Sequence, residues 1–96
     1  MSTRQEAMKE KVSAKITRAE AELKRLRAKE MEAEADAKDK LQEKIAELED
    51  RKEEAEKRLE ELKQAGSNAW EDIKDGVEDA WQSLSDSVSD ASKRFQ

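Results

Sequence analysis

Carboxylates and cationic side chains are the main chemically active groups in this 96-residue chain, because it contains no His and no Cys. Catalysis and metal binding need such groups to converge in a pocket, whereas carboxylates at this density usually form a solvated helix surface. Residues 72–76 have a superficial likeness to a calcium loop but lack its alternating Asp residues and its later Glu. A small basic patch at residues 24–29 is flanked by glutamates. We therefore expect no enzyme activity, no catalytic or metal site and no cofactor.

Composition indicates a helical protein with a narrow core. Charged residues make up 47% of the chain and aromatic residues 3%, with no Pro and two Gly, which is typical of coiled coils. The net charge is −5, and residues 66–96 contain three basic and seven acidic residues. This balance argues against nucleic acid and anionic membranes as main partners. The absence of Cys fits a reducing compartment, and the sequence has no apolar leader and no apolar stretch of the roughly 20 residues needed to span a membrane.

The segment 1–65 is predicted to be a long, charged coiled-coil helix, uninterrupted over residues 4–65. Ala, Glu, Lys, Leu and Arg dominate it, and these are strong helix formers. Residues 66–68 form a Gly/Ser joint, in which we expect Gly66 to end one helix and Asn68, with Glu71, to cap the next. A helix that continues through Gly66 stays open, because the apolar spacing keeps its phase. Either way the chain is a single all-α domain.

Core positions in the long helix follow an order that is nearly mirrored about Leu41. Small residues on one side correspond to large residues on the other, and Glu30 corresponds to Lys52. Constant volume along a seam is what close packing requires, so the pattern predicts a second copy packed antiparallel. The residues predicted to mediate this self-association are Ile16, Ala19, Leu23, Leu26, Glu30, Ala33, Ala37, Leu41, Ile45, Leu48, Lys52, Ala55, Leu59 and Leu62.

A parallel dimer is the less favourable arrangement, because it places Glu30 on Glu30 and Lys52 on Lys52 in a dry seam. The predicted fold is therefore a long helix plus a shorter C-terminal helix, a helical hairpin that forms an antiparallel coiled-coil homodimer or bundle. Two alternatives remain: other oligomers, and a monomer folded back on itself. The folded-back monomer needs a turn within residues 36–44, which contain no Gly or Pro.

Residues 69–96 are predicted to form an amphipathic, acidic C-terminal helix. One face is apolar at helical spacing and the other is rich in Asp, Glu and Ser. This face either packs on the long helix, which we favour, or lies on a lipid surface or a partner helix. Its residues are Trp70, Ile73, Val77, Trp81, Leu84, Val88 and Phe95, together with Ala91.

The stretch Leu41–Lys63, followed by Ala69–Trp81, resembles small uncharacterised bacterial coiled-coil proteins with a Trp-containing, apolipoprotein-like C-terminal helix. The resemblance implies a small, all-helical cytoplasmic protein without catalytic residues. We therefore expect a non-enzymatic, self-associating structural or interaction module that forms a homo-oligomer. The alternative is a reversible lipid-surface or stress-protective amphipathic protein with weak membrane-surface contact. The physiological partner is not predicted.

Overall fold

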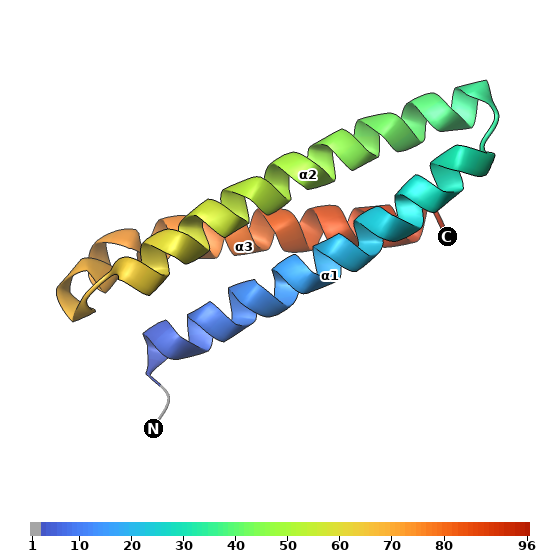
Figure 1. Cartoon of the computed structure of the whole chain (residues 1–96). Helices are drawn as coiled ribbons and strands as arrows, with labels where there is room; N and C mark the ends of the chain where they lie inside the picture. Colours follow the sequence, from blue (N-terminus) through green and yellow to red (C-terminus); the bar gives the residue numbers. More distant parts are fainter. Residues whose placement is uncertain (1–2) are drawn as a thin grey trace.

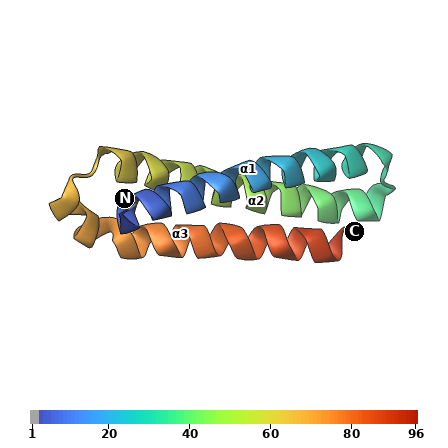
Figure 2. The same cartoon turned by 90° about the horizontal axis from the view of Figure 1, so that it is seen from below.

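Three helices form an elongated bundle in the computed structural model, which describes residues 3–96. They are α1 (Arg4–Glu32), α2 (Ala35–Gln64) and α3 (Ser67–Arg94). The bundle measures 51 × 22 × 18 Å, so its length is set by single helices of about 30 residues. The chain runs up α1, down α2 and up α3, which makes α1 and α3 parallel neighbours (Figures 1 and 2).

The prediction of one uninterrupted helix over residues 4–65 is wrong. The first helix ends at Glu32, and both Ala33 (φ −80°, ψ 148°) and Glu34 (φ −76°, ψ 166°) are extended. The turn also lies before the segment 36–44 considered for a folded-back monomer. Figure 1 shows α1 and α2 meeting at this turn as the two arms of a hairpin.

The position of the turn follows from the weakness of the core stripe around it. Between Leu26 and Leu41 the stripe offers only Glu30, Ala33 and Ala37. A straight helix would bury little apolar surface there, whereas folding back allows Leu26 and Leu41 to be buried in one core. Burial on both sides of the turn therefore outweighs the local preference for helix.

The chain turns again at Ala65 (φ −76°, ψ 133°) and Gly66 (φ −77°, ψ 173°), so a helix continuing through Gly66 is wrong. The details differ from those expected of a Gly stop signal. Gly66 is the N-cap of α3, its φ is negative, and Asn68 lies inside the helix. The Gly66 carbonyl accepts the Trp70 N–H at 3.1 Å. Both turns of the bundle thus share one extended–extended backbone, which needs no Gly.

The core is a single cluster drawn from all three helices. Residues equally distant from the α1–α2 turn lie at the same level, since both helices rise by about 1.5 Å per residue. At the far end, Gln5 Nε2 donates to the Leu62 carbonyl at 3.1 Å and to the Ala65 carbonyl at 2.9 Å. The buried apolar cluster comprises Val12, Ile16, Ala19, Leu23, Leu26, Leu41, Ile45, Leu48, Ala55, Leu62, Val77, Leu84, Val88 and Ala91.

Candidate interaction surfaces

Most of the predicted self-association stripe is used inside one chain. Nine of its members are buried in the bundle: Ile16, Ala19, Leu23, Leu26, Leu41, Ile45, Leu48, Ala55 and Leu62. Glu30, Ala33, Lys52 and Leu59 are half-buried, and Ala37 is exposed. A second copy therefore has no open apolar seam to occupy while the hairpin is closed.

Glu30 and Lys52, the predicted intermolecular pair, have other partners within the chain. Glu30 Oε1 accepts from Gln42 Nε2 at 3.2 Å across the α1–α2 turn. Lys52 Nζ lies 3.8 Å from Glu56 Oε1, one turn further along α2. Both contacts can be replaced by others at little cost in free energy, because Glu30 and Lys52 are only half-buried and solvated pairs of this kind contribute little to stability. The pairing of Glu30 with Lys52 of a second chain stays a prediction.

The apolar face of the C-terminal helix lies against α1 and α2. Val77, Leu84, Val88 and Ala91 are buried, and the larger Trp70, Ile73, Trp81 and Phe95 are half-buried at the edges of the core. Ala80 and Ser87 are also buried. Sequence reasoning missed these last two, although their spacing from Val77, Leu84 and Ala91 places them on the same face.

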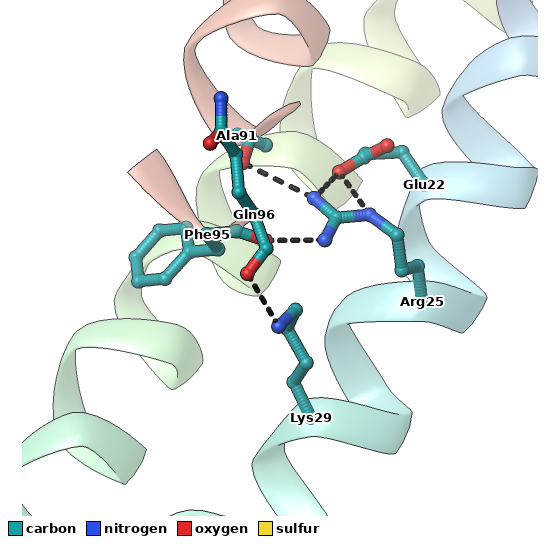
Figure 3. Close-up of polar contacts among 6 residues, drawn as sticks. All are labelled: Glu22, Arg25, Lys29, Ala91, Phe95 and Gln96. Carbon is teal, nitrogen blue, oxygen red and sulfur yellow. Dashed lines mark hydrogen bonds and ion pairs between the residues drawn. The ribbon is translucent and has the colours of Figure 1, made fainter. Parts of the chain in front are cut away.

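The C-terminal end of α3 is attached to α1 through Arg25. This guanidinium donates to the Ala91 carbonyl at 3.2 Å and to the Phe95 carbonyl, and its other contact is the Glu22 carboxylate (Figure 3). The carbonyls at the end of a helix carry partial negative charge, and the Ala91 carbonyl also accepts the Phe95 N–H at 3.1 Å. Arg25 therefore caps α3 from a neighbouring helix.

Lys29 extends this attachment by one turn. Its Nζ donates to the Gln96 carbonyl at 2.8 Å, just beyond the end of α3 (Figure 3). Both cations belong to the basic patch at residues 24–29, which is flanked by glutamates in the sequence. Part of that patch thus has a structural role that charge counting along the sequence could not identify, since its acceptors lie far away in the chain.

A long groove follows the boundary between the parallel helices α1 and α3. Its first hollow, of about 470 Å³, surrounds Trp70 and includes Arg4, Met8 and Lys74. A hydrogen bond with Glu71 raises the pKa of Lys74. This end of the groove combines an aromatic surface with charges of both signs.

The second hollow, of about 730 Å³, is lined by cationic residues and by no acidic residue, unlike the first. Its lining residues are Lys11, Ala14, Lys15, Arg18, Ser85, Val88, Ser89, Ser92 and Lys93. Trp81 lies beside it, with Lys11 Nζ 3.8 Å and Lys15 Nζ 5.5 Å from the ring centroid. Ammonium groups over an indole face are attracted by the ring quadrupole. We call this second hollow the basic groove.

Comparison with known proteins adds no family to this description. No model of a protein family matches the chain, and neither does any curated protein or solved structure. Within residues 3–96, no helix is long and apolar enough to cross a membrane. In the same range, His, Cys, Asp and Glu side chains form no group of three or more that could hold a metal ion.

Proposed function

We propose that the protein is a non-enzymatic structural module that self-associates by exchanging α1 between two copies. In the exchanged dimer, Ala33 and Glu34 become helical and α1 and α2 merge into one helix of about 90 Å. Two such helices cross antiparallel at the former turn. Each α1 then packs on α2 and α3 of the other copy and makes the contacts that it makes within one chain.

The composition of the α1–α2 turn is the observation that carries this proposal. Residues 31–35 are Met, Glu, Ala, Glu and Ala, all strong helix formers, yet the chain is extended at Ala33 and Glu34. Glu34 makes no side-chain cap for α2. At residues 33 and 34 the local sequence therefore favours a helix, whereas the packing of the closed bundle requires a turn. Short hinges of this kind favour domain swapping, because the opened form keeps the core and gains helical hydrogen bonds.

The position of the end of α3 is compatible with the exchange. Phe95 lies near the turn, where it lines a shallow hollow with Ala33 and Leu41. Each α3 thus ends short of the crossing point (Figures 1 and 2). In the dimer the two Phe95 rings lie near the two-fold axis. The exposed Met31 side chain, 84% accessible in the single chain, lies within three residues of the same axis.

Proline at position 35 tests the proposal, because it suits the closed turn and opposes the straight helix. Ala35 is the first residue of α2, where proline is well tolerated, and Glu34 before it already has the extended backbone that proline requires. Inside a continuous helix, the same proline costs about 3 kcal/mol. We expect Ala35→Pro to remain folded and to lose the dimer that the unmodified chain forms at high concentration, measured by light scattering after size exclusion.

Ser67→Pro is the matched control. Ser67 is the first residue of α3 and also follows an extended residue, so the substitution is chemically the same at the other turn. It should leave the dimer intact, since α2 and α3 stay separate helices in the exchanged form. Equal loss of dimer in both variants, or an unmodified chain that remains monomeric at millimolar concentration, would overturn the proposal.

A dimer centred on Leu41 is the competing register, because it pairs Glu30 with Lys52 of the partner. In the register centred on the turn, Glu30 instead lies level with Ala37 of the partner. Exchanging the two charges, Glu30→Lys with Lys52→Glu, separates the registers. Rescue of the dimer by the double variant, relative to either single variant, would indicate the Leu41 centre. We expect no such rescue.

A further inference from the structure

We propose that the basic groove between α1 and α3 binds a short linear chain of phosphate groups. This inference is independent of self-association, because the proposed exchange keeps the contacts between α1 and α3 and therefore leaves the groove between them unchanged. The groove contains three lysines, one arginine and three serines, and no carboxylate lines it. The whole chain has a net charge of −5, so a groove whose charged lining residues are all cations differs strongly in charge from the rest of the protein.

Three carboxylates near the groove on the same two helices are already engaged by other residues. Glu22 pairs with Arg25, and Asp86 accepts from Gln82 Nε2 at 2.8 Å. Asp90 lies 2.7 Å from Lys44 Nζ and 3.5 Å from Arg94.

The four cations that line the groove lack such partners. Within residues 3–96, Lys11, Lys15, Arg18 and Lys93 form no ion pair. Their charges are thus left without an ion-pair partner in this part of the chain, although Lys11 and Lys15 also lie over the Trp81 ring.

The spacing of the groove residues favours an extended ligand over a compact one. Lys11, Lys15 and Arg18 follow the i, i+4, i+7 pattern that places them in one row along α1. Because α1 and α3 are parallel, the serine row at residues 85, 89 and 92, with the same spacing, runs beside it. Both rows extend over about 10 Å. A chain of phosphates can follow the row, whereas a single phosphate meets one or two cations at a time.

The serine hydroxyls of α3 and the Trp81 indole contribute further to binding and to its detection. Ser85, Ser89 and Ser92 can donate hydrogen bonds to phosphate oxygens opposite the cations. Trp81 forms the apolar support on which Lys11 and Lys15 rest in the free protein. An anion in the groove draws these ammonium groups toward it, so binding should change the environment of the Trp81 ring. The chain has two Trp, and removal of Trp70 leaves Trp81 as the single reporter.

The test is a fluorescence titration of the full chain carrying Trp70→Phe, with inorganic tripolyphosphate as the probe. We expect a saturable change in Trp81 emission that weakens with added salt. The triple variant Lys11→Gln, Lys15→Gln and Arg18→Gln should bind at least about tenfold more weakly. The matched control removes three exposed lysines of α2 with the same change in charge: Lys40→Gln, Lys57→Gln and Lys63→Gln. It should bind within about threefold of the parent.

Further probes identify which part of the ligand is recognised. Equal binding of tripolyphosphate and ATP indicates that the phosphate chain suffices, and tighter binding of ATP indicates added contacts from the nucleoside. Orthophosphate should bind at least about tenfold more weakly than tripolyphosphate. The proposal is overturned by an absence of saturable binding, by equal weakening in the groove and control variants, or by orthophosphate binding as well as tripolyphosphate. Dimer mass should be unchanged in the groove variant, which separates this test from that of self-association.

Discussion

Lys44 Nζ lies 2.7 Å from Asp90 Oδ2 and 2.6 Å from Glu47 Oε2, although the lysine side chain is only 4% exposed. The contact joins α2 to α3, and Lys44 is the only charged residue counted as buried among residues 3–96. The spacing of apolar residues did not predict that Lys44 is buried, because a lysine counts as a polar residue in such a pattern. Its methylene stem packs in the core while its ammonium reaches the carboxylates at the edge.

Two substitutions of Lys44 distinguish the contribution of its methylene stem to stability from the contribution of its charge. Lys44→Met keeps most of the apolar stem and should change the free energy of unfolding by less than about 1 kcal/mol, since the half-exposed Asp90 can be hydrated instead. Lys44→Ala removes about three buried methylenes and should cost about 2 kcal/mol. Urea denaturation of both variants measures the difference. Equal losses would mean that the ion pair, not the stem, stabilises this site.

The same contact predicts a dependence of stability on pH. The hydrogen bond and charge of Lys44 lower the pKa of Asp90 below its ordinary value of 3.8. Because the pKa of Asp90 is lower in the folded protein than in the unfolded chain, its ionised carboxylate stabilises the fold fully at pH values above the unfolded-state pKa. This stabilisation is lost as the pH falls through the folded-state pKa. We expect Asp90→Asn to be less stable than the parent at pH 7 and equally stable well below pH 3.8. A difference between the two that stays constant to low pH would contradict this assignment.

Loss of the Arg25 cap should loosen the end of α3. Arg25→Gln removes the donors to the Ala91 and Phe95 carbonyls and should cost about 1 kcal/mol. Amide hydrogen exchange should rise first in the last turns of α3, because opening starts at a frayed end. Arg27→Gln is the control, since that exposed residue pairs with Glu49 and should change stability by less than about 0.5 kcal/mol. Similar exchange profiles in the two variants would exclude the capping role.

The periodicity of the apolar residues predicts much of this architecture. Helical spacing identified the stripe from Ile16 to Leu62 and the apolar face from Trp70 to Phe95, and most residues of both are buried in the core or packed against it. It could not identify the turn at Ala33 and Glu34, because no residue there disfavours helix. A helix break that depends on burial far along the chain leaves no local signal.

The contacts between helices were harder to predict than the helices. The attachment of Arg25 and Lys29 to the end of α3 joins residues more than 60 positions apart, and it depends on the register of two parallel helices. The basic groove has the same origin, since its lysines and serines belong to separate periodic rows that only packing brings together. The mirror about Leu41 describes one register of the stripe, and the closed hairpin uses another.

The two glycines should respond differently to alanine. A Cβ at Gly76 would lie 3.5 Å from the Arg58 guanidinium, an ordinary contact, and Gly76 is inside α3. Gly76→Ala should therefore stabilise the protein by about 0.5–1 kcal/mol. Gly66 has a negative φ and nothing within 4 Å of an added Cβ, so Gly66→Ala should be tolerated. Thermal unfolding checks both, and a large loss at position 66 would instead indicate a left-handed turn.

Tryptophan emission distinguishes core packing of α3 from lipid binding. Trp81 is half-buried with its indole nitrogen shielded from solvent, so the Trp70→Phe variant should show blue-shifted emission in buffer alone. Neutral liposomes should change this emission little, because release of α3 would sacrifice apolar burial of about 25 cal/mol per Å². Emission that resembles that of solvated Trp until liposomes are added would support a lipid-surface protein.

Exchange of α1 between copies is tested most directly by a distance within one chain. Spin labels on cysteines at the exposed positions Glu10 and Lys57, equally distant from the turn, report whether the hairpin is closed; the chain has no native Cys to interfere. The doubly labelled protein is diluted in excess unlabelled protein, so that only distances within a chain contribute. We expect a short distance in the monomer fraction, where the helix axes are about 10 Å apart, and about 70 Å in the dimer fraction. A dimer fraction that retains only the short distance would show that the copies associate with closed hairpins, and it would contradict the exchange.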